Sequence, residues 1–109
     1  STAKELLTAD ESEIYVSGIS IAELACAVEM RRITIDRHWK KWFRYYSDLN
    51  AWMVENISLE IMEEAYSLPG VFHADPADRI ITATARLNHC TILTADKKIL
   101  SYPHVDSAW

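Results

Sequence analysis

Apolar residues along the chain follow two alternating periods, one typical of strands and one typical of helices. Short β-prone runs predict strands at 14–17, 52–54, 91–94 and 105–109. Apolar residues at helical spacing, together with capping residues, predict helices at 2–8, 20–31, 36–49, 58–68 and 76–88. Strands that alternate with helices indicate an α/β fold with a mostly parallel sheet.

Several residues mark where these helices begin and end. Asp36 and Ser58 stand where an N-cap side chain accepts a hydrogen bond from the first backbone N–H groups of a helix. Pro76 stands at a first helical position, where proline is tolerated, and Pro69 with Gly70 ends the preceding helix. Capping residues and helix breakers therefore indicate where the helices begin and end, in addition to the periodicity that predicts them.

The chain has 109 residues, of which 50% are hydrophobic, and this is enough for one compact domain over residues 1–109. Its two glycines and three prolines form no linker cluster. Cys26 and Cys90 lack the spacing of a metal site, which predicts buried free thiols in a reducing cytosol. We find no leader and no apolar run of membrane length, so we expect a cytoplasmic protein without membrane contact.

Acidic residues stand where predicted strands give way to helices. Glu23 follows the first of these strands, Asp78 lies in the first turn of the helix at 76–88, and Asp96 follows the strand at 91–94. Parallel neighbouring strands would bring such side chains to one edge of a sheet, where open α/β folds bind ligands. Carboxylates that close would repel one another, whereas Mg²⁺ or Mn²⁺ would keep them ionised. The layout therefore predicts a divalent-cation site and phosphodiester chemistry.

Each acid alone also has a purely structural explanation. Ser20 and Glu23 have the spacing of a capping box. Asp75 is a suitable N-cap, Asp78 suits a first helical turn, and Asp96 could cap a short helix after it. Both explanations stay open for each residue, and the cation site depends on the location that the three acids share.

Two residues near these acids have favoured structural roles. His73, two residues before Asp75, is more often a packing or hydrogen-bonding residue than a metal ligand. Arg79 could reach a phosphate, but a pair with a nearby carboxylate is the favoured interpretation. The chain offers no Ser-His-Asp or Cys-His arrangement for covalent catalysis, so an activated water is the expected nucleophile.

Three motifs occur along the chain, and they are Ser17-Gly-Ile-Ser-Ile-Ala-Glu23-Leu, Asp75-Pro-Ala-Asp78-Arg-Ile-Ile-Thr-Ala-Thr-Ala and Leu-Thr94-Ala-Asp96. In this order they resemble the successive motifs of PIN domains, and most closely the VapC-type toxin ribonucleases of bacterial toxin–antitoxin pairs. The resemblance covers most of the chain, and the Asp-Pro-Ala-Asp-Arg segment is fairly specific to that branch.

The resemblance implies a three-layer α/β/α fold with a mostly parallel sheet. It implies that the catalytic carboxylates Glu23, Asp78 and Asp96 bind Mg²⁺ or Mn²⁺, which activates a water to cleave RNA. Asp75 is implied as a neighbouring acid that holds a metal-bound water, and Thr94 as a hydroxyl beside the site, available to substrate. The implied partners are an RNA substrate and a VapB-like antitoxin.

One part of the family's motif set is missing. The family begins with an aspartate at the end of a first central strand, whereas Asp10 precedes the strand at 14–17. We therefore expect this strand and its helix to lie upstream of Ser1, and a chain without that acid to be a poor nuclease. Exposed strand edges in such a truncated domain would also favour a homodimer.

The segment 31–46 combines cations with aromatic residues, although the net charge of the chain is −5. Six of the 11 Lys and Arg residues lie within 31–44, and Lys40, Lys41 and Arg44 are candidates for binding RNA phosphates. The aromatic side chains at 39, 42, 43 and 46 recur at helical spacing, which favours burial over stacking on bases. In VapC-like proteins this region also tends to accept the antitoxin and to contribute to the dimer.

Three functions are compatible with the sequence. The first is a metal-dependent endoribonuclease toxin, and the second is a PIN remnant that binds antitoxin or RNA without cutting. The missing aspartate favours the second, so whether this chain is an active enzyme stays open. The third is a metal-binding phosphatase or receiver-like domain, which would need an acidic nucleophile after its first strand, and none is found there.

Overall fold

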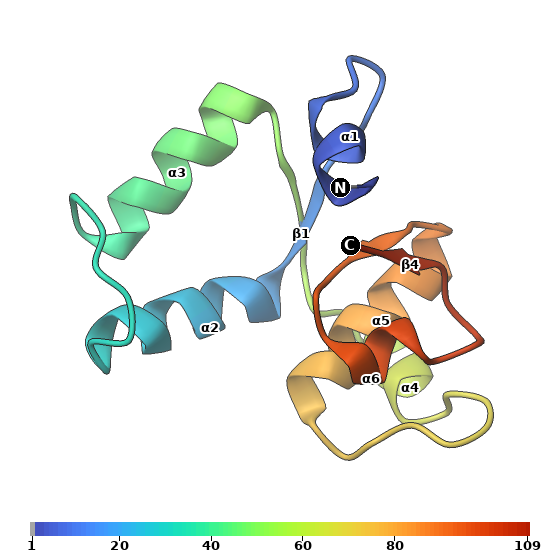
Figure 1. Ribbon diagram of the computed structural model, residues 1–109. Helices are drawn as coiled ribbons and strands as arrows, with labels where there is room; N and C mark the ends of the chain where they lie inside the picture. Colours follow the sequence, from blue (N-terminus) through green and yellow to red (C-terminus); the bar gives the residue numbers. More distant parts are fainter. Residues whose placement is uncertain (1) are drawn as a thin grey trace. The chain divides into compact units, whose positions relative to one another are not determined.

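The computed structural model describes residues 2–109, which form two compact units (Figure 1). One unit comprises residues 13–56, and the other comprises residues 2–12 with 57–109. Each unit contains helices and a pair of parallel strands. The predicted α/β class and the predicted parallel pairing are thereby confirmed, while the expected single domain stays a prediction.

The unit at 13–56 is a strand–helix–helix–strand segment. Its elements are β1 (Tyr15–Ser17), α2 (Gly18–Glu29), α3 (Trp39–Asn50) and β2 (Met53–Glu55). β1 and β2 pair in parallel with Val16 opposite Val54, so α2 and α3 form the crossover that a parallel pair requires. Both predicted strands are present, each within one residue of its expected start.

Both helices of this unit begin at a different cap from the expected one. α2 begins after Ser17, whose hydroxyl oxygen accepts from the backbone N–H of Ile19 at 3.3 Å. The predicted start at Ser20 is wrong because Ser17, directly after β1, already provides a cap. α3 is capped by His38 and not by Asp36, since the Asp36 carboxylate accepts two hydrogen bonds from Arg37, at 3.1 and 2.9 Å.

The second unit contains the C-terminal half of the chain and one N-terminal helix. Its elements are α1 (Thr2–Thr8), α4 (Leu59–Ala65), α5 (Pro76–Asn88), β3 (Ile92–Leu93), α6 (Lys97–Leu100) and β4 (Ser107–Ala108). β3 and β4 pair in parallel, with Ile92 opposite Ser107. The described strands therefore form two sheets of two strands, where the sequence predicts one continuous sheet.

The core of this unit lies between α4 and α5. Ala65 of α4 and Ala83 of α5 are fully buried, and their small side chains let the two helices approach closely. Arg86 of α5 also pairs with Glu64 of α4, with Nε 2.8 Å from Oε1. A second buried cluster joins Ala85 of α5 to residues of β3 and α6. Because the same core contains residues of α5 and α6, the N-termini of these two helices belong to one packed unit.

α4 is shorter than predicted, and the cysteines differ in exposure from the prediction. The helix ends at Ala65 and not at 68, and the carbonyl of Ala65 accepts from Nη1 of Arg79 at 3.0 Å. Neither Cys26 nor Cys90 is part of a disulfide within residues 2–109. Their predicted burial is wrong, because Cys26 is exposed on α2, a helix with no buried residue, and Cys90 is half-buried.

Candidate active site

The start of α5 carries the two acids of the Asp-Pro-Ala-Asp motif. Asp75 is the N-cap, and its Oδ2 accepts from the backbone N–H of Asp78 at 3.0 Å. Pro76 occupies the first helical position, where no backbone N–H is needed. The predicted capping role of Asp75 is confirmed, and Asp78 lies in the first turn, where a negative charge is favourable.

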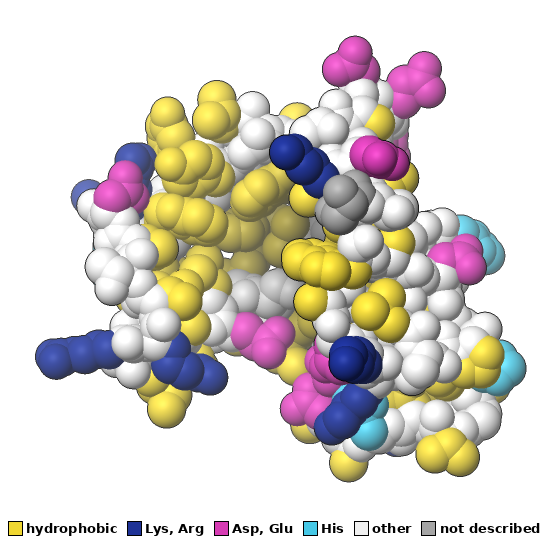
Figure 2. All heavy atoms as spheres, viewed as in Figure 1, with side chains coloured by type: hydrophobic (Ala, Val, Ile, Leu, Met, Phe, Trp, Pro, Cys, Tyr) yellow, Lys and Arg dark blue, Asp and Glu magenta, His cyan; other side chains and the backbone are white. Residues whose placement is uncertain are grey.

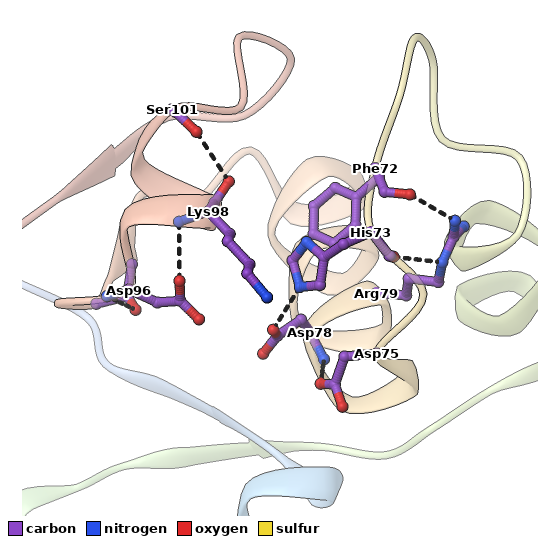
Figure 3. A network of polar contacts seen from close by, with 9 residues as sticks. Phe72, His73, Asp75, Asp78, Arg79, Asp96, Lys98 and Ser101 are labelled. Atoms are coloured by element: carbon purple, nitrogen blue, oxygen red, sulfur yellow. Dashed lines mark hydrogen bonds and ion pairs between the residues drawn. The ribbon is translucent and has the colours of Figure 1, made fainter.

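Asp78 has a second partner that lies before the helix. Nε2 of His73 is 2.6 Å from Oδ2 of Asp78, and their side chains are 23% and 22% exposed (Figure 3). The imidazole stacks on Phe72, with ring centroids 4.5 Å apart and planes 19° from parallel. The hydrogen-bonding role predicted for His73 is therefore confirmed, and its partner is the central acid of the motif.

Arg79 holds the segment that precedes α5. Its Nε donates to the carbonyl of His73 at 2.9 Å, and its Nη2 donates to the carbonyl of Phe72 at 2.9 Å. Nη1 donates to the carbonyl of Ala65 at the end of α4. Backbone carbonyls occupy all three nitrogens, so the expected pair with a carboxylate is wrong. The guanidinium ties the loop between α4 and α5 to the first turn of α5.

Asp96 lies in the turn between β3 and α6. Its Oδ1 accepts from the backbone N–H of Lys98 at 2.8 Å, which confirms the predicted N-cap. Thr94 shapes the same turn, because its hydroxyl oxygen accepts from the backbone N–H of Asp96 at 3.0 Å. Asp78 and Asp96 thus stand at the N-termini of two helices in one unit, each with one carboxylate oxygen in a hydrogen bond.

Lys98 is a residue near the acids that the sequence analysis did not identify. Its side chain is exposed and extends from α6 toward the carboxylate of Asp78 (Figure 3). Its position could have indicated it, because Lys98 follows Asp96 by two residues in a helix of four residues. An ammonium group beside carboxylates is suited to contact a phosphate oxygen that approaches them.

Glu23 lies in the other unit, in the middle of α2. Its side chain is exposed and lines a shallow hollow together with Cys26 and Arg32 of the same unit. The predicted capping box with Ser20 is wrong because α2 begins at Gly18, which places both residues inside the helix. This excludes the capping box alone, and the role of Glu23 with the two aspartates stays a prediction.

The donor chemistry of these acids fits a hard divalent cation. Carboxylate oxygens are the ligands that Mg²⁺ prefers, and within the described residues the hydrogen bond from His73 uses Oδ2 of Asp78 and leaves Oδ1 for another partner. Within residues 2–109, however, no three His, Cys, Asp or Glu side chains gather as a metal site would require. The predicted ligand set of Glu23, Asp78 and Asp96 therefore stays a prediction.

α3 carries the cations and aromatic residues of the basic segment. Lys40, Lys41 and Arg44 are exposed, so they remain candidates for binding RNA. The aromatic side chains pack on one another, for example Trp42 on Tyr46 with centroids 4.9 Å apart, but α3 has no fully buried residue. The predicted burial of these aromatic residues is therefore only partial.

Hydrophobic side chains gather over α2 and α3 in the space-filling view (Figure 2). The exposed large apolar side chains of this unit include Met30, which directly follows α2, and Leu49 of α3, at 69% and 65%. Within its unit α2 packs mainly against α3 and β1.

Comparison with known proteins decides the family. The PIN domain model matches residues 1–105 of the chain. The chain belongs to the PIN-domain family. Ribonuclease VapC22 of Mycobacterium tuberculosis is 32% identical over 92 residues, which is 84% of this chain and 69% of that relative. The VapC-type resemblance of this PIN domain is thereby confirmed. No solved structure matches the chain. Within residues 2–109, no helix is long and apolar enough to cross a membrane.

Proposed function

We propose that this PIN domain is a Mg²⁺- or Mn²⁺-dependent endoribonuclease, the toxin of a toxin–antitoxin pair, with Glu23, Asp78 and Asp96 as its cation-binding acids. The observation that carries the proposal is the ordered carboxylate of Asp78. It stands in the Asp-Pro-Ala-Asp motif that resembles the VapC branch and leaves one oxygen available, and Asp96, the N-cap of α6, lies in the same unit.

The chain's own residues have distinct tasks in this proposal. The three acids hold the cation, which when bound makes a water more acidic and offsets charge on the scissile phosphate. Asp75 is placed to accept a hydrogen bond from a water near Asp78, since it lies in the same helical turn. Thr94 keeps Asp96 in its turn, and Lys98 contacts the phosphate of the approaching RNA strand.

The proposal is tested by cleavage of a labelled RNA with the purified chain, in Mg²⁺ or Mn²⁺ and in EDTA. Asp78→Asn keeps the shape of the side chain but removes its charge, so we expect cleavage to fall by about 100-fold or more, as the loss of a ligand should exceed that of an outer residue. Asp106→Asn is the matched control, because Asp106 is an exposed aspartate of the same unit.

Two results would contradict the proposal. Cleavage that persists in EDTA, or that Asp78→Asn leaves unchanged, would exclude these acids as a cation site. A chain that binds RNA or antitoxin tightly but cleaves nothing in either metal would instead support the alternative function, a PIN remnant that acts as a binding module.

We also propose that the exposed apolar side chains of α2 and α3 pair two copies of the chain and accept the antitoxin. The support is their exposure, since Met30 and Leu49 are large apolar residues with little cover. Leu49→Glu should lower the molar mass in light scattering from a dimer to a monomer and should weaken antitoxin binding. A wild-type chain that is monomeric at micromolar concentration would contradict the dimer.

A further inference from the structure

We propose that His73 is a positioning residue that holds the Asp78 carboxylate in the orientation that binds the cation. The inference rests on the proposed function, in which Asp78 is a ligand, and it adds a residue to that site. Nε2 of His73 lies 2.6 Å from Oδ2 of Asp78, within reach of a short, charge-assisted hydrogen bond.

The carboxylate is held through both its backbone and its side chain. The backbone N–H of Asp78 donates to Asp75, which fixes the start of the helix, and the imidazole of His73 fixes Oδ2. Free rotation of the carboxylate is thereby removed, and Oδ1 is the oxygen left for a ligand. Both side chains are less than a quarter exposed, so water competes weakly for this hydrogen bond.

The imidazole of His73 is itself held in place by packing. It stacks on Phe72, and Phe72 meets the ring of Tyr102 edge-on, with centroids 4.8 Å apart. The hydroxyl of Tyr102 donates to the carbonyl of Pro69 at 2.5 Å, which fastens this ring to the same loop. Burial raises the pKa of Tyr102, so its hydroxyl stays protonated and remains a donor.

The backbone of the same loop is fastened by Arg79. Its hydrogen bonds to the carbonyls of Phe72 and His73 anchor the loop to the first turn of α5, the turn that contains Asp78. A histidine that served only for packing would not need its polar edge on an acid. Carboxylate ligands in metal sites are generally held by such outer hydrogen bonds, whose loss typically costs about 10–100-fold in metal affinity.

The experiment compares two variants that separate packing from hydrogen bonding. His73→Phe keeps the stacking on Phe72 and removes the donor, whereas His73→Gln places an amide N–H near the position of Nε2. His104→Phe is the matched control, because His104 is a histidine of the same unit that packs edge-on against another ring, that of Tyr102, with centroids 5.4 Å apart. For each variant we would measure the Mn²⁺ dissociation constant by electron paramagnetic resonance, kcat and KM for RNA cleavage, and thermal unfolding.

We expect His73→Phe to weaken Mn²⁺ binding by about 10–100-fold and to lower kcat more than it raises KM, with the fold retained. His73→Gln should recover most of the affinity, and His104→Phe should bind Mn²⁺ as the wild type does. If His73→Phe binds Mn²⁺ normally while Asp78→Asn does not, the role of His73 is overturned and the proposed function is not. A wild-type chain without Mn²⁺ affinity overturns the proposed function and, with it, this role of His73.

If His73→Phe unfolds, His73→Gln is compared with His73→Ala instead. A folded glutamine variant with near-normal Mn²⁺ affinity, beside a folded His73→Ala variant with weakened affinity, supports the positioning role. Equal affinity of the alanine and glutamine variants overturns it.

Discussion

Single carboxylates in this chain have structural roles that leave room for the proposed chemical one. Asp75 and Asp96 each use one oxygen to cap a helix, and Asp78 uses one oxygen to accept from His73. A carboxylate has two oxygens and several lone pairs, so a capping bond still leaves acceptor capacity for a cation. The structural and catalytic interpretations of these acids are therefore compatible.

The buried hydroxyl of Thr82 allows a test of how an unsatisfied polar group affects the stability of the core. Thr82 is fully buried in α5, and within residues 2–109 its Oγ1 has no hydrogen-bond partner. Thr82→Val removes an unsatisfied polar group with almost no change of shape. We expect the free energy of unfolding in urea to rise by about 1 kcal/mol.

Thr84→Val is the matched control for that substitution. Thr84 is also buried in α5, but its hydroxyl donates to the carbonyl of Ile80 at 2.7 Å, so the valine variant loses a hydrogen bond. It should be less stable than the wild type by about 1 kcal/mol. A Thr82→Val variant destabilised as much as Thr84→Val would mean that the Thr82 hydroxyl has a partner in solution.

At the scale of elements, Arg79 decides how the loop between α4 and α5 is placed. Its planar guanidinium donates to carbonyls at two ends of that loop, at Ala65 and at Phe72 with His73. A lysine ammonium cannot satisfy the same fork of acceptors. Arg79 thus limits the length of α4 as well as the position of the loop.

Arg79→Lys should therefore lower the free energy of unfolding by about 2 kcal/mol, since hydrogen bonds that involve a charged group are lost. It should also weaken Mn²⁺ binding, because His73 is less firmly held. Urea unfolding and Mn²⁺ titration measure the two effects. If Arg79 instead binds an RNA phosphate, the lysine variant would keep its stability and lose only RNA affinity.

The expected helix caps were accurate for α4, α5 and α6 and wrong for α2 and α3. Ser58, Asp75 and Asp96 cap α4, α5 and α6 as predicted, because each cap bond spans no more than three residues. Asp36 failed as a cap because its neighbour Arg37 takes both carboxylate oxygens, and those hydrogen bonds lower the pKa of Asp36. Propensity alone does not rank such competing partners.

At the scale of the whole molecule, charge distribution matters more than the net charge of −5. Lys40, Lys41 and Arg44 are exposed on α3 and form a local basic surface in an acidic protein. Substituting all three by glutamine should weaken RNA binding measured in EDTA. The slope of log K against log salt should become shallower by roughly 2, given about 0.7 for each phosphate contact of a single strand.

Lys4→Gln, in α1, is the control for the general effect of charge. The basic surface would be excluded from RNA binding if the triple variant and Lys4→Gln gave equal salt slopes. A triple variant that loses cleavage but keeps the wild-type slope would point to damage at the acids and not at α3.

The sequence by itself determined the helices and strands, the parallel α/β class, the family and the identity of the candidate acids. These depend on periodicity, on caps and on motifs, which are encoded within a few neighbouring residues. Only the tertiary structure decided the partners of Arg79, the contact of His73 with Asp78 and the bond from Tyr102 to Pro69. The last of these spans 33 positions, and such contacts follow from how α4, α5 and their loop pack. The physical reason is that spacing fixes which face a residue occupies, whereas side-chain reach and packing select its partner.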